Sequence, residues 1–245
     1  MKKLILTSIC VFLIASGSLR AQDEEVGLLS KFGFAGGFNA AWLLPNMDDL
    51  NNVLPAGVEK FSNSGFLGFG GSGYVYLMIV DNLRIGGIGL SGTTTSTGFR
   101  DGFNKEVEYS IGLGGVTVEY TLPFIESIGV SFGGIIGVGS STINIYQNKG
   151  NMNWSDIWGE VSNPARTTQN ISRKLKNTFF TLVPTLNVDI PVSRFASLRL
   201  GAGYIMALGE NWKGDNDIQL NGVPSSLKGN SFFIQTGIMI GFISY

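Results

Sequence analysis

Bulky apolar residues and small residues alternate along most of the chain, in segments of ten or more positions. Between 128 and 146, for example, Val130, Phe132 and Ile136 hold one set of alternate positions, while Gly and Ser hold most of the other set. A period of two is the pattern of a β-strand with two different faces. Eight such segments are expected as strands, at 31–43, 65–80, 83–95, 105–121, 128–146, 174–190, 196–208 and 230–245.

The connections between these segments alternate in length. Three are short, at 81–82, 122–127 and 191–195, and four are long and polar, at 44–64, 96–104, 147–173 and 209–229. The first long connection contains a segment, 46–60, that could form a short helix broken at Pro55. Short turns at one end and long loops at the other are typical of outer-membrane barrels. The pattern therefore predicts an all-β fold, an antiparallel up-and-down eight-stranded transmembrane β-barrel with short periplasmic turns and long external loops.

The two faces of the expected strands differ in size more than in charge. A soluble barrel would turn its bulky apolar side chains inward and charged ones outward, but here the second face carries Gly and Ser. Small side chains suit the narrow interior of an eight-stranded barrel, so we expect the bulky face to contact lipid. Two of the strands keep this phase only with bulges at Gly86–Gly87 and Gly114–Gly115. These bulges would turn Ile88, Leu90, Ile111 and Leu113 outward and Glu108 inward.

Besides Glu108, four charged residues fall on the expected interior face. Arg84 and Glu119 lie near the periplasmic ends of neighbouring strands, and Asp189 and Arg199 flank one turn. Charges inside a narrow barrel are tolerated chiefly when they are paired and hydrogen-bonded. We expect structural ion pairs that plug the barrel, and a proton or ion path is the alternative.

Composition removes most catalytic chemistry. The chain of 245 residues has no His, which excludes triads that use His and the usual zinc sites. Its one Cys, Cys10, lies in the segment expected to direct export, so the mature chain would have no thiol nucleophile. The formal net charge of −1 gives no basic footprint for nucleic acid. We therefore expect a protein that is not an enzyme and holds no cofactor or metal.

The N-terminus has the layout of a secretory signal peptide. Two lysines follow Met1, residues 4–15 are apolar, and small or polar residues lead to Ala21. The apolar stretch is too short for an ordinary membrane-spanning helix, which needs about 20 residues. We expect residues 1–21 to be a signal peptide containing Cys10, and residues 22–245 to form a single barrel domain.

The chain ends in an apolar strand, 231–245, with the aromatic residue Tyr245 last. With the export signal and the uneven loops, it resembles small Gram-negative outer-membrane β-barrel proteins of the OmpX type, or the transmembrane domain of OmpA. The resemblance implies a place in the outer membrane, contact with its lipid, and assembly by the barrel-assembly machinery. The family pattern would turn Met239 and Ile243 outward, whereas composition favours Ile238 and Phe242.

The leading hypothesis for function is a non-enzymatic outer-membrane barrel with a structural role or with loops that bind an external partner. Candidate loop contacts are Trp154, Trp158, Arg166 and Trp212, and a basic group could contact lipopolysaccharide phosphates. This group comprises Arg166, Arg173, Lys174 and Lys176. The alternatives are a narrow porin, a conduit for hydrophobic ligands, or a secreted soluble β-barrel that encloses an apolar ligand.

Overall fold

The computed structural model describes residues 33–77, 79–125, 127–150, 153–162, 170–224 and 227–242. The expected signal peptide, with Cys10, lies outside these residues, as do Arg166, Ile243 and Tyr245.

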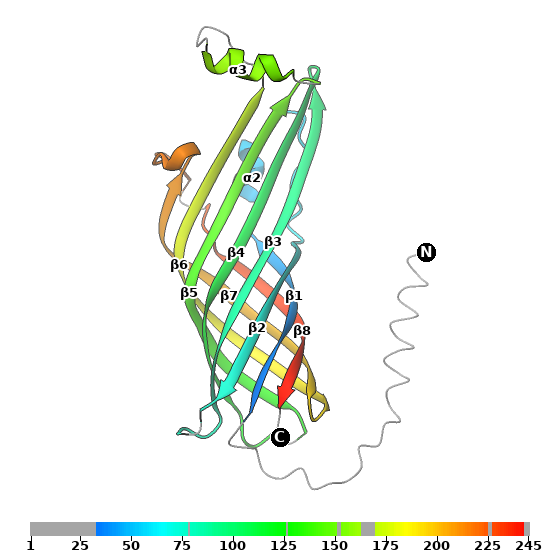
Figure 1. The fold of residues 1–245 in the computed structure, drawn as a ribbon, viewed down its shortest axis with the longest axis vertical. Helices are drawn as coiled ribbons and strands as arrows, with labels where there is room; N and C mark the ends of the chain where they lie inside the picture. Colours follow the sequence, from blue (N-terminus) through cyan, green and yellow to red (C-terminus); the bar gives the residue numbers. More distant parts are fainter. Residues whose placement is uncertain are drawn as a thin grey trace, which may run out of the picture.

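Eight antiparallel strands form one closed barrel, in which each strand pairs with its neighbours in chain order and β1 pairs with β8 (Figure 1). This confirms the predicted fold class. The strands are β1 (Phe34–Pro45), β2 (Phe66–Tyr76), β3 (Leu83–Arg100), β4 (Phe103–Thr121), β5 (Gly129–Asn148), β6 (Ile171–Ser193), β7 (Ala196–Lys213) and β8 (Ser231–Phe242).

Strands β3 to β7, of 18 to 23 residues, are longer than β1, β2 and β8, and β3 to β6 rise past the other strands at one end of the barrel (Figure 1). We call this the loop end, and the opposite end, where β1 begins and β8 finishes, the turn end. The expected long loop at 96–104 is wrong, because β3 and β4 continue as a hairpin to a turn at Asp101–Gly102. Both turn residues have positive φ, 56° and 80°, as a tight turn that matches strand twist requires.

Short helices accompany the strands at the loop end. Helix α2 (Asp48–Val53) lies in the connection after β1, within the segment expected to form a helix, and α3 (Trp154–Ser162) sits above the long strands (Figure 1). A three-residue 3-10 turn, η2 (Asp215–Asp217), follows β7. Over the described part of the chain, no helix is long and apolar enough to cross a membrane.

The bulky face of the strands points outward, as expected. Phe38, Ile136 and Phe180 are each more than half exposed, at 58%, 66% and 70%. The hypothesis of a soluble barrel with these side chains inside is therefore wrong. In β8, Ile238 and Phe242 point outward while Met239 is fully buried, so composition predicted this strand better than the family pattern did.

The expected bulges at Gly86–Gly87 and Gly114–Gly115 do not occur, since the pairing of β3 with β4 is continuous. The pairing shifts instead between β6 and β7, beside Thr178 and Pro191. As a result four residues expected to face lipid are interior, and Glu108, expected inside, lies on the outer face beside Asn144. The four interior residues are Ile88, Leu90, Ile111 and Leu113.

These side chains belong to an apolar core inside the loop half of the barrel. The core joins inward residues of the long strands, such as Tyr109, Ile143 and Phe179, to Leu50 of α2 and Phe61 of the following loop. Asn51 fixes that loop by accepting a hydrogen bond from the Phe61 N–H (2.7 Å) and donating one to its carbonyl oxygen (3.0 Å). The interior of this half is therefore packed like the core of a soluble protein.

Candidate functional site

The turn half of the interior holds a cluster of four buried charges. Arg84, Glu119, Asp189 and Arg199 are each at most 4% exposed. Arg84 donates from Nε to Glu119 Oε2 (2.7 Å), from Nη1 to Asp189 Oδ2 (2.6 Å), and from Nη2 to Ser131 Oγ. Arg199 donates from Nε and Nη2 to the two Asp189 oxygens at 2.7 and 3.0 Å. The structure thus brings the four residues expected as two pairs into one network.

The registers of the strands place these side chains together. Arg84 on β3 lies directly beside Glu119 on β4, and Asp189 on β6 lies beside Arg199 on β7. Each residue occupies an inward position close to the turn end of its strand, so all four project into the same short length of the lumen. Two positive and two negative charges leave the cluster neutral, which is the condition under which buried charges are tolerated.

Neutral groups complete the cluster. Asn187 donates from Nδ2 to Glu119 Oε1 (2.9 Å) and accepts at Oδ1 from Gln235 Nε2 (2.9 Å). The ring of Tyr74 lies 4.5 Å from Arg84 Cζ and 4.9 Å from Arg199 Cζ, within range of a cation–π interaction. Sequence reasoning missed Tyr74 as a member, although its place at an inward position among small residues of β2 was a usable signal.

The residues expected as loop contacts lie in different settings. Trp154 and Trp158 are 76% and 56% exposed on α3, and their rings meet edge to face with centroids 5.7 Å apart. Trp212 is different, because it is only 5% exposed and belongs to the apolar core inside the loop half. Its expected role as an external contact is therefore inconsistent with its position. Arg166 lies outside the described residues.

The basic residues Lys174 and Lys176 lie on the outer face of β6. Nearby, Asp215 accepts from Arg173 Nη1 (3.3 Å) and from the backbone N–H of Lys174 (2.7 Å). In the part of the chain that the structure describes, no group of three acidic, His or Cys side chains could hold a metal ion.

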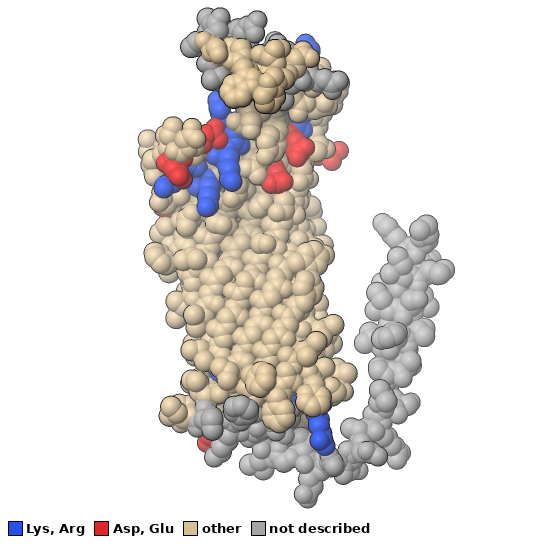
Figure 2. All heavy atoms as spheres, viewed as in Figure 1, with Lys and Arg blue, Asp and Glu red and all other residues tan. Residues whose placement is uncertain are grey.

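The outer surface has an apolar band around its middle. Figure 2 shows that the visible face there is free of Lys, Arg, Asp and Glu, while charged side chains gather above the band, toward the loop end. On β4 the band ends between Val116 and Ser110. A closed barrel with such a band satisfies every strand edge and meets hydrocarbon with apolar side chains. The chain therefore forms a closed β-barrel with the apolar outer band of a membrane-spanning barrel.

The similarity of this chain to known proteins lies in structure and not in sequence. No family model and no curated protein matches the sequence. Among solved structures, a major outer membrane protein from Thermus thermophilus is 10% identical, with a TM-score of 0.49, 86% of this chain covered and 99% of that one. OprG from Pseudomonas aeruginosa is 12% identical, with a TM-score of 0.43 and coverages of 86% and 95%. Neisserial surface protein A is 11% identical, with a TM-score of 0.37 and coverages of 86% and 97%.

Proposed function

We propose that the chain is a non-enzymatic outer-membrane barrel whose lumen is sealed and whose external extension, formed by the loop ends of β3 to β6 and by α3, presents binding surfaces. The observation that carries this proposal is the filling of the interior at two levels. The turn half holds the neutral cluster around Arg84, and the loop half holds the apolar core around Phe179. A barrel of eight strands encloses about enough space for side chains alone.

The apolar core argues against a narrow porin, and the charge cluster argues against a conduit for hydrophobic ligands. An ion would have to leave water for the apolar core at the loop end, which is costly for a charge without partners. A hydrophobic ligand would have to cross the neutral but strongly polar network at the turn end. The long strands and α3 instead carry exposed side chains away from the membrane, where a rigid scaffold commonly holds binding loops.

Three further elements belong to the proposal. Residues 1–21 direct export, the barrel-assembly machinery inserts the chain, and the external extension contacts lipopolysaccharide or an external partner. Trp154 and Trp158 on α3 are the exposed aromatic side chains best placed for a partner.

Liposome leakage tests the sealed lumen. We expect vesicles that contain the folded full chain to retain small ions and a small apolar dye as well as protein-free vesicles do. Heat-dependent mobility on SDS gels would verify in the same samples that the barrel is folded. Leakage of ions would support a narrow porin, and uptake of the apolar dye alone would support the hydrophobic conduit; either result would refute the sealed lumen.

A further inference from the structure

Outward-facing glycines lie side by side on three neighbouring strands of the apolar band, next to a second such row formed by Gly36, Gly73 and Gly87. Gly71 on β2, Gly89 on β3 and Gly114 on β4 are direct cross-strand neighbours and all point outward. The same row continues to Phe38 on β1 and to Val138 on β5. In this row, three positions without side chains therefore lie between the large side chains of Phe38 and Val138.

Packing within the protein does not require the glycines at 89 and 114, whereas a Cβ atom at Gly71 would lie 3.2 Å from the Gly37 carbonyl oxygen. A Cβ atom added at Gly89 would have no neighbour within 4 Å, and at Gly114 its nearest neighbour would be Ile88 O at 3.8 Å. Interior glycines are different, since a Cβ atom at Gly70 or Gly86 would collide with the backbone of the adjacent strand. Glycine weakens a strand, and where packing does not explain it, it often marks the close approach of a ligand or another backbone.

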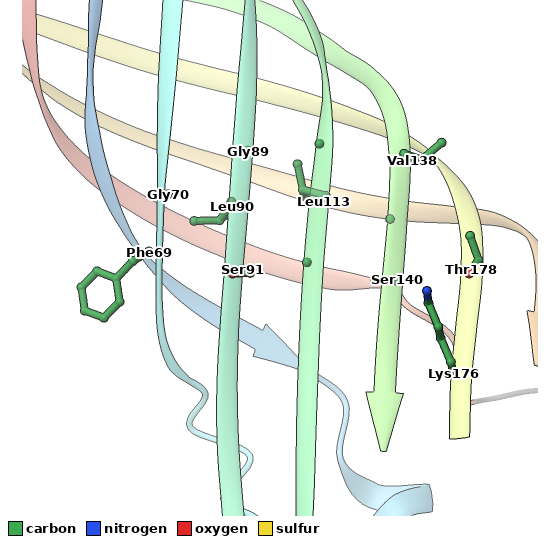
Figure 3. Close-up of a pocket in the computed structure, with 13 residues that line it drawn as sticks. Phe69, Gly70, Gly89, Leu90, Ser91, Leu113, Val138, Ser140, Lys176 and Thr178 are labelled. Carbon is green, nitrogen blue, oxygen red and sulfur yellow. The ribbon is translucent and has the colours of Figure 1, made fainter. Parts of the chain in front are cut away.

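The backbone at Gly89 and Gly114 forms part of the floor of a hollow of about 530 Å³ on the outer surface (Figure 3). Phe69 borders the hollow on one side, and Val138 and Thr178 border it on the other. Its lining is apolar around Gly114 and becomes hydroxylic at Ser91, Ser140 and Thr178, which belong to the next row of cross-strand neighbours toward the loop end.

A positively charged side chain, Lys176, lies at the end of the hollow that carries these hydroxyl groups. Lys176 lines the hollow, and its side chain extends from β6 toward Ser140 (Figure 3). Within the described ranges no carboxylate forms an ion pair with Lys176, and Lys174 adds a second positive charge on the same face. Two acidic residues, Glu106 and Glu108, lie on the adjoining outer face of β4, and Glu108 accepts a hydrogen bond from Asn144 Nδ2 (2.7 Å).

We infer that this hollow binds a phosphorylated lipid of the outer leaflet. The acyl part lies over Gly89 and Gly114, and the phosphate accepts hydrogen bonds from the Lys176 ammonium and from the hydroxyls of Ser140 and Thr178. The inference rests on the proposed membrane barrel and deepens it, because it names the lipid chemistry and the site. Lipid is the occupant that the position favours, since the floor belongs to the apolar band while the cation lies where that band ends.

A second copy of the chain fits this surface less well. A symmetric dimer uses the same patch on both partners, so two copies joined through this hollow would bring two lysine-bearing faces together. Repulsion between like charges opposes that arrangement, whereas a phosphate neutralises it.

Native mass spectrometry of the folded full chain tests the inference. The protein would be reconstituted in phosphatidylcholine vesicles that contain either diphosphorylated lipid A or the same lipid with its phosphates removed, then extracted so that retained lipids can be counted. We expect preferential retention of the phosphorylated form. Lys176→Gln should lower its retention about fivefold, the effect of one lysine near a charged lipid surface. Gly89→Leu fills the hollow and should reduce retention to the level of the dephosphorylated lipid.

Matched variants control for nonspecific change. Gly134→Leu adds the same side chain to the outer face of β5, where a Cβ atom meets only Val183 O at 3.5 Å, and Lys60→Gln removes a charge from the loop after α2. Both should retain lipid as the unaltered chain does. Three results would overturn the inference. The first is equal retention of the two lipids, and the second is an equal loss of lipid in the test and control variants. The third is the loss of a dimer in Gly89→Leu without any change in the retained lipid. Gel mobility and vesicle leakage in the same samples report separately on the proposed sealed barrel.

Discussion

Replacing Asp189 by Asn probes the buried charge cluster most directly. Asp189 accepts three hydrogen bonds from guanidinium groups, one from Arg84 and two from Arg199. Asn has nearly the same shape but carries no charge, and one of its two terminal groups is a donor that would face a guanidinium. The cluster would change from neutral to a net charge of +1 while remaining buried.

Breaking a buried ion pair from one side costs about 3–5 kcal/mol, because the remaining charge keeps its desolvation penalty and loses its partner. We expect Asp189→Asn to destabilise the barrel by that amount. The assay is urea unfolding in lipid vesicles, followed by tryptophan fluorescence and by loss of the heat-modifiable band on SDS gels. As a control, Asp215→Asn removes a carboxylate from a surface pair whose side chains are 65% and 38% exposed, and should cost about 1 kcal/mol or less.

A second variant separates charge balance from packing. Adding Arg199→Met to Asp189→Asn leaves the Arg84–Glu119 pair, with its 2.7 Å contact, and restores neutrality. The double variant should be more stable than the two single losses predict, by about 0.5–3 kcal/mol, the usual coupling between contacting residues. If Asp189→Asn costs no more than the surface control, or if the two losses simply add, the cluster is not the coupled network inferred from its geometry.

Three other predictions test packing inside the barrel, away from the charge cluster. Gly70→Ala should abolish the heat-modifiable band, because its Cβ atom would collide with Gly89 O, whereas Gly89→Ala should leave the band unchanged. Leu113→Asn places an amide in the apolar core and should cost about 1–3 kcal/mol in urea unfolding, the penalty of a buried polar group without a partner. Trp212→Ala should cost about 3–5 kcal/mol in the same assay, whereas Trp154→Ala should leave stability unchanged and remove fluorescence that acrylamide quenches readily.

The sequence predicted the strands well because side chains alternate between the two faces of a β-strand in lipid, in water and inside a protein. It also placed Arg84, Glu119, Asp189 and Arg199 on the interior face, since each alternates with bulky outward neighbours. It could not show that the four form one network, because contact between Arg84 on β3 and Asp189 on β6 depends on the register of strands far apart in the chain.

The end of the β3–β4 hairpin was missed for a physical reason. Ser, Thr and Gly dominate residues 91–98, a composition typical of loops, yet these residues form paired strands that rise beyond the apolar band. Their outward side chains meet water, so polar residues suit them. The turn at Asp101–Gly102 carried a local signal, because that dipeptide favours the positive φ angles of a hairpin turn.

The expected bulges failed because one solvent was assumed along the whole length of each strand. Near the turn end of β4, Val116 and Val118 point outward while Glu119 points inward; near the loop end, Glu108 points outward while Tyr109 and Ile111 point inward. The polarity of the two faces therefore inverts within a continuous strand, with no change of register. The proposed membrane location accounts for this inversion, because an outer face that contacts lipid along the first part and water along the second would be apolar only along the first. In the sequence this inversion resembles a shift in the alternation of inward and outward side chains. The structure shows why no shift occurs: inside the loop half, the inward apolar side chains pack with Leu50 and Phe61.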